Sequence, residues 1–585
     1  MTKTTNEDAS SAELLSALYR LVYDEQQATN HQLMSIWERP LTDKLRKGLT
    51  QGFTRIERGP EPATLRAWPD DSESRFREGD LVCLHQGNAL EPLCRKLSFE
   101  LEEDDYWLLR GSRVAAIFDD YAGGACYADP DTMDLTRFHE QTLDDIGTST
   151  IGKKILLPLL SGKLEITFDE NDMDEARAAA LAKNFNDKQA EAVGWAHGAR
   201  QTACIQGPPG TGKTRVLALI AQLAVARGER VLMTSHTHTA INNALNKIHE
   251  QGVPVVKIGR ATQRKGLDGA IPNFEGIADW EDRPTGGCVV GATPFATSTS
   301  RLENTLFDTI LFDEASQITV SLALMAMRRG RRFIFIGDQR QLPPVLLSRS
   351  VLDKATHSVF SRLTSREAEH LIMLDETYRM NRWLTDWPSR AYYDGELRAN
   401  RENRERRLEL RDIPTRFSAV LAGDNPAVFI PTPDASACTR NRKEAEWVAD
   451  LCEAIIAGGL PAAEIGIVSP YRAQGRTLRG LLARRLGRET ARQIVADTVE
   501  RMQGQERELI ILSLATGDAA FLGMVAGFFF QPERLNVSIT RAKTKLIVIG
   551  PENVSLPDDG DETIRQWIAS YLDMIGYCRR VALEA

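Results

Sequence analysis

The chain has 585 residues, too many for one hydrophobic core, and its length predicts about three or four domains. Its 42% apolar and 26% charged residues are typical of a soluble globular protein, and its eight singly placed cysteines, without a CxxC pair, argue against zinc modules and iron–sulfur clusters. The net charge of −9 excludes a uniformly basic nucleic-acid coat, although it allows a local basic groove.

The first 180 residues divide into a helical and a β-rich part. Leucines at helical spacing, interrupted by Pro40, predict a pair of helices in residues 1–50. In residues 51–180, short β-like runs such as Leu97 to Leu101 and Val114 to Phe118 alternate with turn residues. We therefore expect an N-terminal helical stalk followed by a small antiparallel barrel or sandwich.

From residue 181 onward, apolar runs alternate with helical stretches, as in a parallel sheet covered on both faces. The first series spans 181–365 with an insertion expected at 252–287, and the second spans 366–585 and begins with Leu371 to Leu374. Only the first series carries a phosphate-binding loop. The fold class is therefore α/β, and we expect two lobes that share one nucleotide.

The phosphate-binding loop follows the apolar run Ala203 to Ile205 and precedes a predicted helix from Arg215 to Arg227. It reads Gly207-Pro208-Pro209-Gly210-Thr211-Gly212-Lys213-Thr214. Glycines let backbone N–H groups close around phosphate oxygens, while Lys213 reaches the β- and γ-phosphates and Thr214 supplies a hydroxyl for Mg²⁺. The loop therefore predicts ATP and Mg²⁺ as ligands; an ordinary Gly-Pro loop is the alternative.

Two further polar groups follow buried strands of the same series. Asp313 and Glu314 come directly after Thr309 to Phe312, where Asp313 can hold the metal and Glu314 can act as the base for the attacking water. Gln341 follows Phe333 to Ile336 and is placed to sense the γ-phosphate. Each pattern alone would be an ordinary polar turn.

Seven motifs in one order resemble the superfamily 1B helicases, in the branch that contains the RNA-surveillance helicase of nonsense-mediated decay. They are GPPGTGKT, DEASQ, GDQRQLPP, LDETYRMN, VSPYRAQ, VERMQGQERELIILS and RLNVSITRAK. The resemblance covers about residues 181–551 and implies two RecA-like domains of the P-loop NTPase kind. Residues 1–180 contain none of these motifs. They resemble the branch only in their expected elements, because its members carry a helical stalk and a small β-barrel before the first RecA-like domain.

The resemblance also implies roles around ATP. Gln189 would hydrogen-bond the adenine edge, Tyr378 would stack on the base, and Glu506, beside Gly504, would meet the ribose. Arg379 and Arg541 would reach the γ-phosphate from the second lobe. ATP would then draw the lobes together, and hydrolysis would let them part.

Single-stranded RNA or DNA is the partner that the resemblance implies, contacted mainly through phosphate and sugar. The nucleic-acid contacts would be Ser235, Thr237, Thr293, Pro343, Pro344 and Thr498. Arginines also cluster in residues 398–411 and 472–492, but glutamates interleave both stretches, so a solvated helix is at least as good an interpretation as a phosphate track.

Several positions depart from the family pattern. Where the family often reads Ala-Val-Asp, this chain has Ala240-Ile241-Asn242-Asn243, and Thr377 stands where relatives usually have Gln. His236 and His238 resemble a metal pair, although two histidines without further ligands are more often polar surface. The zinc-rich and nuclease domains of some relatives have no counterpart here, so their regulation and cleavage are not expected.

We therefore expect an ATP-dependent helicase or translocase on single-stranded nucleic acid, moving 5′ to 3′ as the resemblance implies. One alternative is an ATP-gated clamp or nucleoprotein remodeller that does not separate strands. Another is the motor subunit of a larger nuclease or defence complex. No apolar run is long enough to span a membrane, the richest being Gly523 to Phe530, a buried strand or helix by expectation. With no signal-peptide core either, we expect a cytoplasmic protein without membrane association.

Overall fold

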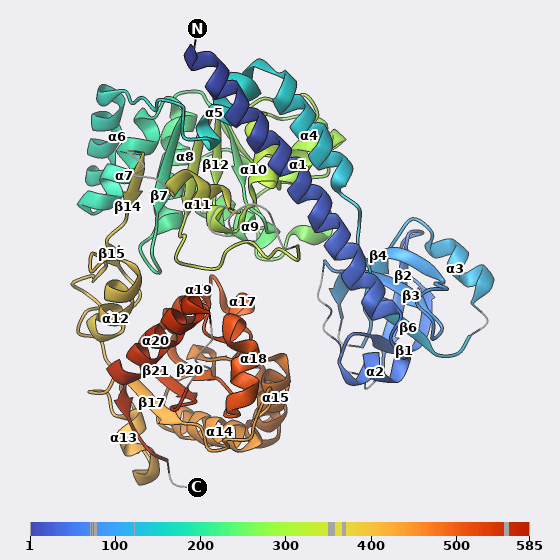
Figure 1. Cartoon of the computed structure of the whole chain (residues 1–585), viewed down its shortest axis with the longest axis vertical. Coiled ribbons are helices and arrows are strands. Elements are labelled where there is room, and N and C mark those ends of the chain that lie inside the picture. Colours follow the sequence, from blue (N-terminus) through green and yellow to red (C-terminus); the bar gives the residue numbers. More distant parts are fainter. Residues whose placement is uncertain are drawn as a thin grey trace.

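A computed structural model of the chain describes residues 2–583 apart from 71, 73, 75, 77–78, 104, 122, 349–356, 366–369 and 555–560. Its longest element is the 36-residue helix α1 (Thr2–Trp37), which runs diagonally across the first lobe and ends at a separate barrel (Figure 1). None of the helices in these ranges is both long and apolar enough to cross a membrane.

Helix α1 joins two parts of the molecule. Leu14, Leu18 and Val22 pack into the core of the first lobe, against α4 (Thr136–Thr148). At the other end of α1, Leu33 and Trp37 pack on the barrel, and Trp37 Nε1 donates a hydrogen bond of 2.8 Å to the Pro130 carbonyl. The predicted helical pair in residues 1–50 is confirmed, with α2 (Leu41–Arg46) as its second member.

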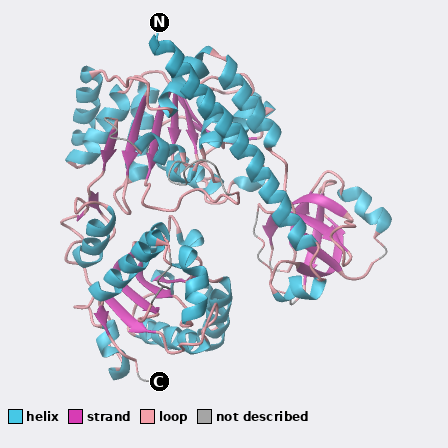
Figure 2. Ribbon diagram, in the orientation of Figure 1, coloured by secondary structure: helices cyan, strands magenta, loops and turns pink. Residues whose placement is uncertain are grey.

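Six antiparallel strands close the barrel in the order β1-β2-β5-β4-β3-β6 (Figure 2). They are β1 (Gln51–Arg58), β2 (Thr64–Pro69), β3 (Leu81–His85), β4 (Cys94–Glu102), β5 (Trp107–Arg110) and β6 (Cys126–Pro130). Phe99 and Trp107 stack at its centre, with ring centroids 4.0 Å apart. The expected barrel is therefore present, but the structure ends it at Pro130 and not at residue 180.

Helices occupy two stretches of the part that the sequence predicted to be β-rich. The run Val114 to Phe118 lies in α3 (Val114–Asp120), where Val114 and Ile117 are buried three residues apart, the spacing of one helix face. Beyond the barrel, residues 136–182 form helices that pack on the first lobe. They are α4, the π-helical η1 (Gly152–Leu156), α5 (Leu157–Leu160) and α6 (Glu170–Ala182).

The first lobe is built on eight strands, all parallel, in the order β10-β9-β11-β8-β12-β13-β7-β14. They are β7 (Thr202–Gln206), β8 (Arg230–Thr234), β9 (Val255–Ile258), β10 (Asn273–Phe274), β11 (Cys288–Gly291), β12 (Thr309–Phe312), β13 (Arg332–Gly337) and β14 (Leu371–Met373). Alternate residues face opposite sides: Ile310 and Phe312 join one core cluster, and Leu311 joins the other.

Helices cover both faces of this sheet, as the continuous apolar strands predict. The covering helices are α7 (Asp187–Gly198), α8 (Lys213–Ala226), α9 (His238–His249), α10 (Val320–Met327) and α11 (Val359–Thr364). Short 3₁₀ turns complete the lobe: η2 (Ala261–Gln263), η3 (Ile277–Asp279), η4 (Pro294–Ser298), η5 (Ser300–Leu302) and η6 (Ala315–Gln317).

Two strand assignments differ from the prediction. The expected insertion at 252–287 contributes β9 and β10, which extend the first sheet beside β11. The run Leu371 to Leu374 was expected to open the second sheet, but β14 pairs with β7 and forms an edge of the first. The expected domain boundary at 365–366 borders residues 366–369, which lie outside the described ranges.

The second lobe has six parallel strands in the order β19-β18-β20-β21-β17-β22. They are β17 (Ala427–Pro431), β18 (Ile465–Val468), β19 (Val495–Asp497), β20 (Arg507–Ser513), β21 (Ala542–Gly550) and β22 (Arg579–Arg580). The strands β15 (Glu376–Thr377) and β16 (Arg398–Ala399) form a small separate pair beside α12 (Arg382–Tyr392), between the two lobes (Figure 1). The two RecA-like sheets expected from the sequence are thus present.

The helices of the second lobe pack around that sheet. They are η8 (Thr415–Phe417), α13 (Ser418–Leu421), α14 (Arg442–Ala457), η9 (Ala462–Glu464), α15 (Arg472–Leu486), α16 (Arg488–Gln493), α17 (Val499–Met502), α18 (Ala519–Phe529), α19 (Pro532–Ile539) and α20 (Glu562–Tyr577). The run Gly523 to Phe530 lies largely in α18, but it is only partly buried, since Met524 is 78% exposed. The prediction of a buried strand or helix is therefore confirmed for the helix and for residues such as Phe529, but not for the burial of the whole run.

Candidate active site

The phosphate-binding loop joins the end of β7 to the start of α8. Gly210 and Gly212 have φ values of +75° and +81°, a region that favours glycine. A Cβ on Gly207 would lie 2.2 Å from Cγ of Lys213, and one on Gly210 would lie 2.5 Å from Cβ of Arg379. Side chains in place of these glycines would therefore occupy the concave inner face of the loop. Within it, Lys213 Nζ donates a hydrogen bond of 2.5 Å to the Gly207 carbonyl.

The acidic pair follows β12 at the carboxyl edge of the sheet. Asp313 is buried, and burial together with the neighbouring Glu314 raises its pKa, whereas Lys213 acts in the opposite direction. Glu314 has a φ of +51°, an uncommon conformation for a residue with a side chain. Such backbone strain costs about 1–3 kcal/mol and concentrates at functional sites. Glu314 faces the cavity described below, and Asp313 lies beneath it.

A buried hydrogen-bond network joins the lobes behind Gln341. Asp338 Oδ2 accepts hydrogen bonds of 2.8 Å from both Gln341 Nε2 and Tyr393 Oη. Asn536 of α19 donates 2.8 Å hydrogen bonds to Tyr393 Oη and to the Arg340 carbonyl. The sequence prediction missed Asp338, Tyr393 and Asn536, although Asp338 and Asn536 lie inside the motifs GDQRQLPP and RLNVSITRAK.

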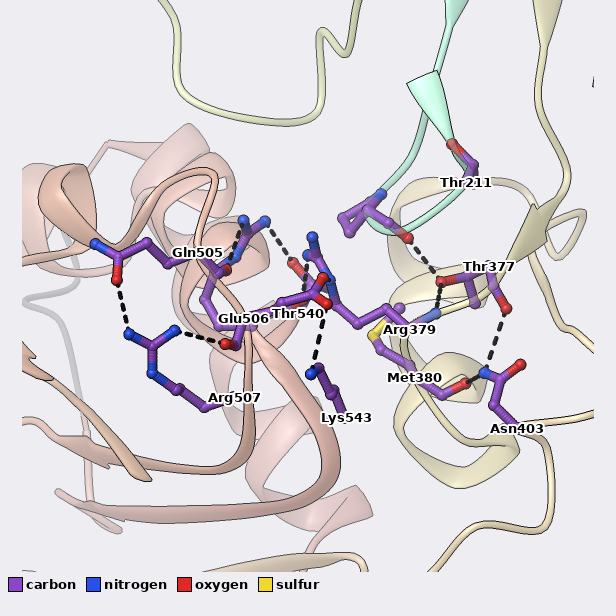
Figure 3. A network of polar contacts seen from close by, with 12 residues as sticks. Thr211, Thr377, Arg379, Met380, Asn403, Gln505, Glu506, Arg507, Thr540 and Lys543 are labelled. Carbon is purple, nitrogen blue, oxygen red and sulfur yellow. Dashed lines mark hydrogen bonds and ion pairs between the residues drawn. The ribbon is translucent and has the colours of Figure 1, made fainter. Parts of the chain in front are cut away.

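The two predicted arginines lie close to this network, and Arg541 contacts Gln341 directly. Arg379 Nε lies 2.6 Å from Glu506 Oε2, and its Nη1 donates to the Thr540 carbonyl at 2.9 Å (Figure 3). Arg541 is only 2% exposed, and its Nη2 lies 3.5 Å from Gln341 Oε1 of the first lobe. Burial and the nearby Arg379 lower the pKa of Arg541 to about 9, so its guanidinium stays charged at neutral pH.

A cavity of about 330 Å³ unites these groups. It is lined by Pro209, Gly210, Thr211, Gly212, Lys213, Thr214, Arg215, Glu314, Gln341, Tyr378, Arg379, Gly504, Glu506 and Arg541. Lys213 of one lobe and Arg541 of the other thus share a single crevice. Among the predicted ATP-site residues, Gln189, Gly207, Pro208 and Asp313 lie behind this lining.

The predicted base-binding residues are held by the loop and its neighbours. Gln189 Nε2 donates to the Thr211 carbonyl at 3.0 Å, while its Oε1 accepts from the Asn186 N–H in the capping box of α7. Asn186 also donates to Tyr378 Oη at 2.9 Å, and Tyr378 is 40% exposed at the cavity mouth. Each end of the Gln189 amide therefore already has one partner within the protein.

Thr377 ties β15 to the phosphate-binding loop. Its Oγ1 donates to the Pro209 carbonyl at 2.8 Å, and the N–H of Tyr378 donates to the Gly210 carbonyl at 2.8 Å. Figure 3 shows Thr377 between the loop and Asn403, whose Nδ2 donates to the Thr377 carbonyl. Thr377 therefore has a structural role.

The donor set at the loop fits Mg²⁺, which binds hydroxyl and carboxylate oxygens and keeps several waters. Thr214 lines the cavity, and Asp313 follows β12 at the same sheet edge. Among the described residues, no group of three or more His, Cys, Asp or Glu side chains gathers as a metal site. His238 Nδ1 lies 3.1 Å from Lys257 Nζ, so that ring nitrogen already has a partner within the protein.

The predicted nucleic-acid contacts of the first lobe share the carboxyl edge of its sheet. Ser235 and Thr237 follow β8, Thr293 follows β11, and Pro343 and Pro344 follow β13. Ser235 Oγ is buried and finds no hydrogen-bond partner within the described ranges. Thr237 Oγ1 accepts from the Ala240 N–H and caps α9.

In the second lobe, Thr498 is buried where β19 leads into α17. It also lines a small cavity with Tyr471 and arginines of α15. The contact predicted for Thr498 thus lies beside the second arginine cluster.

The two arginine clusters differ in their surroundings. In the first, Arg406 pairs with Glu508, as expected of a solvated surface. In the second, α15 borders a cavity of about 600 Å³ that also reaches α2. Five arginines from three segments line it: Arg46, Arg440, Arg442, Arg476 and Arg484. Arg476 and Arg484 of the second cluster therefore line a cavity together with arginines of other segments.

Known proteins resemble the chain over both lobes. Two family models described as "AAA domain" match residues 184–405 and 355–553. The DNA replication ATP-dependent helicase/nuclease DNA2 of Saccharomyces cerevisiae is 30% identical over 443 residues, which are 70% of this chain but 28% of the yeast protein. The DNA polymerase alpha-associated DNA helicase A of Schizosaccharomyces pombe is 26% identical and matches over 69% of both chains.

The chain thus spans less than a third of the yeast DNA2 protein. Among solved structures, an Arterivirus nonstructural protein 10 (helicase) aligns over 90% of this chain and 82% of its own, with 14% identity and a TM-score of 0.39.

Proposed function

The chain belongs to the superfamily 1B helicases, in their DNA2/NAM7-like branch, and on that premise we propose that it is an ATP-driven helicase or translocase on single-stranded nucleic acid. The observation that carries the proposal is the crevice shared by Lys213 and Arg541. A triphosphate held there would contact both lobes. Binding and hydrolysis would therefore close and open the space between them.

The residues of the crevice account for hydrolysis in the following way. Lys213 exchanges the Gly207 carbonyl for the β- and γ-phosphates, and the loop N–H groups hold the phosphate oxygens. Glu314 accepts the proton of the attacking water. Arg379 and Arg541 stabilise the charge on the transferred phosphoryl group, and Gln341 contacts it from the first lobe.

Mg²⁺ would be held by Thr214 and Asp313, and it would neutralise charge on the phosphate oxygens. Mg²⁺ binds the deprotonated carboxylate of Asp313. A bound cation would therefore counteract the burial of Asp313, which raises the pKa of that carboxyl group. Removal of divalent cations with EDTA should therefore abolish hydrolysis.

The nucleic-acid strand would run along the carboxyl edges of both sheets, past Thr293 and Pro344, toward the arginine-lined cavity beside α15. Contacts of this kind read phosphate and sugar and not base sequence. DNA is the first substrate to test, because the named functions of the yeast and fission yeast relatives concern DNA. The 5′-to-3′ polarity and the cytoplasmic location remain predictions from the sequence.

The proposal does not include the nuclease activity in the name of the yeast relative, because this chain covers only 28% of that protein. The test compares ATP hydrolysis with matched single-stranded DNA and RNA oligomers, followed by strand displacement on 5′- and 3′-tailed duplexes. The proposal is supported if an oligomer stimulates ATP hydrolysis and if strands are displaced from duplexes of one tail polarity. ATP-dependent binding without strand displacement would favour the clamp. If neither the DNA nor the RNA oligomer gave ATP hydrolysis, the motor would be refuted.

A further inference from the structure

We propose that the hydroxyl group of Tyr393 is a positioning group for ATP hydrolysis: through Asp338 it orients Gln341, and it does so only while the two lobes are in contact. We call Tyr393, Asp338 and Asn536 the interlobe latch. This role rests on the proposed function, because a positioning residue acts only within a reaction.

Tyr393 belongs to the second lobe. It directly follows α12, is 1% exposed, and packs in the same core cluster as Phe429 of β17 and Leu512 of β20. The N–H groups of Tyr393 and Gly395 donate hydrogen bonds of 2.9 and 3.0 Å to the Ser389 carbonyl, and Gly395 has a φ of +78°. This turn ends α12 and fixes the backbone of Tyr393 in the second lobe.

The Tyr393 hydroxyl group reaches a carboxylate of the first lobe. Asp338 follows β13 and is 1% exposed, and its Oδ2 accepts hydrogen bonds of 2.8 Å from Tyr393 Oη and from Gln341 Nε2. Its Oδ1 accepts from Gln206 Nε2 at 3.3 Å and from the Arg340 N–H at 3.1 Å. Three of these donors belong to the first lobe, and Tyr393 supplies the fourth from the second lobe.

A second contact between the lobes meets at the same hydroxyl group. Asn536 of α19 donates hydrogen bonds of 2.8 Å to Tyr393 Oη and to the Arg340 carbonyl of the first lobe. Figure 1 shows α12 and α19 on the side of the second lobe that faces the first. Burial and the nearby Asp338 carboxylate raise the pKa of Tyr393, so the hydroxyl group keeps its proton and can donate a hydrogen bond to Asp338. The hydrogen bonds therefore run in one direction, from Asn536 to Tyr393 to Asp338.

The amide group of Gln341 is oriented from both of its ends. Asp338 holds Nε2 at 2.8 Å, and Oε1 lies 3.5 Å from Nη2 of Arg541. Gln341 lines the ATP cavity, whereas the three latch residues do not. Separation of the lobes would take Tyr393 and Asn536 away from Asp338, and Arg541 away from Gln341. The latch therefore makes the orientation of Gln341 depend on closure of the lobes.

Removal of the hydroxyl group alone tests the latch. Tyr393→Phe keeps the ring in the core but removes one donor to Asp338 and one acceptor for Asn536. Because misplacement of a group at the reacting centre can lower a rate by about 10²-fold, we expect kcat for strand-stimulated ATP hydrolysis to fall by about 10- to 100-fold. The affinity for a fluorescent ATP analogue should stay within about threefold of wild type, since Tyr393 does not line the cavity.

The neighbouring tyrosine provides a matched control. Tyr392 is also buried, at 8% exposure, and its hydroxyl group makes no hydrogen bond to the first lobe within the described ranges. Tyr392→Phe removes the same atom from the adjacent residue and should keep the wild-type kcat. Both variants are assayed at a temperature at which circular dichroism shows them to be folded. Equal kcat values in the two variants would overturn the inference.

A double-mutant cycle separates positioning of Gln341 from a general loss of structure. The kcat values of Gln341→Ala, Tyr393→Phe and the double variant are compared with that of wild type. If Tyr393 acts through Gln341, kcat of the double variant should lie within about twofold of that of Gln341→Ala. If the two reductions multiply, Tyr393 acts independently of Gln341 and the inference is wrong.

Failure of the inference and failure of the proposed function give different results. If wild type hydrolyses ATP with neither oligomer, the motor is refuted. If a strand stimulates hydrolysis by wild type, yet Tyr393→Phe and Tyr392→Phe turn over ATP at the same rate, only the interlobe latch is refuted.

Discussion

Replacement of Arg541 tests the link between the lobes most directly. Four polar contacts hold its guanidinium: 2.9 Å to the Val537 carbonyl, 3.4 Å to Thr540 Oγ1, and 3.5 Å to the Gln505 carbonyl and to Gln341 Oε1. Three of these are at the long limit of a hydrogen bond, so their loss in Arg541→Ala should cost the fold only about 1–3 kcal/mol.

The expected loss of rate is larger than the loss of stability. A guanidinium on a transferred phosphoryl group contributes about 10³–10⁵ in kcat, or about 4–7 kcal/mol. Arg541→Ala should therefore lower kcat by about 10³-fold or more, while ATP affinity stays within about tenfold. Arg541→Lys should recover only a small part, because an ammonium group cannot donate two parallel hydrogen bonds.

The assay combines steady-state ATP hydrolysis at saturating single-stranded oligomer, binding of a fluorescent ATP analogue, and Tm. Arg534→Ala is the control: Arg534 lies in α19, pairs with Glu500, and does not line the cavity. A kcat within tenfold of wild type in Arg541→Ala, at a Tm showing a folded protein, would contradict the placement of Arg541 at the γ-phosphate.

Four further outcomes are expected. Lys213→Ala should lower ATP turnover by at least about 10²-fold in the same assay, since a preorganised charge is lost; near-normal turnover would argue against the site. Glu314→Gln should bind ATP and retain it unhydrolysed in a filter-retention experiment, and a variant that fails to bind would count against its role as a base. Arg476→Ala should reduce the slope of log affinity against log salt by about 0.7–1 for single strands, whereas Arg488→Ala, in the exposed α16, should not. Burial raises the pKa of Glu444 from 4.5 to about 7, so its stabilising proton is present below pH 4.5 and lost as the pH rises through 7. Unfolding measurements should show wild type losing about 1 kcal/mol more than Glu444→Gln between pH 6 and 8.

The crevice was largely predictable because each motif sits at a strand end. Lys213, Glu314 and Gln341 each follow a buried apolar run, and parallel strands bring their carboxyl ends to one edge. The positions of Arg379 and Arg541 came from the resemblance and not from residue patterns. Their side chains do line the same cavity as Lys213.

Contacts between distant segments could not be predicted. Asp338 and Tyr393 are 55 residues apart, and Tyr393 and Asn536 are 143 apart, so no local pattern joins them. The edge strand β14 was assigned to the wrong lobe because a short apolar triplet pairs equally well with either sheet. In Val114 to Phe118, a short run with several apolar residues fitted a strand as readily as the helix it forms.

The hydrogen bonds from Thr377 and Tyr378 to the Pro209 and Gly210 carbonyls tie the segment that leads into the second lobe to the phosphate-binding loop. If the second lobe turns about this connection, the pivot lies against the nucleotide site. A rotation about this pivot moves the nearby atoms little and the remote surface of the second lobe much. In the proposed motor, a small displacement beside the nucleotide phosphates would thereby become a larger displacement at the far side of the second lobe.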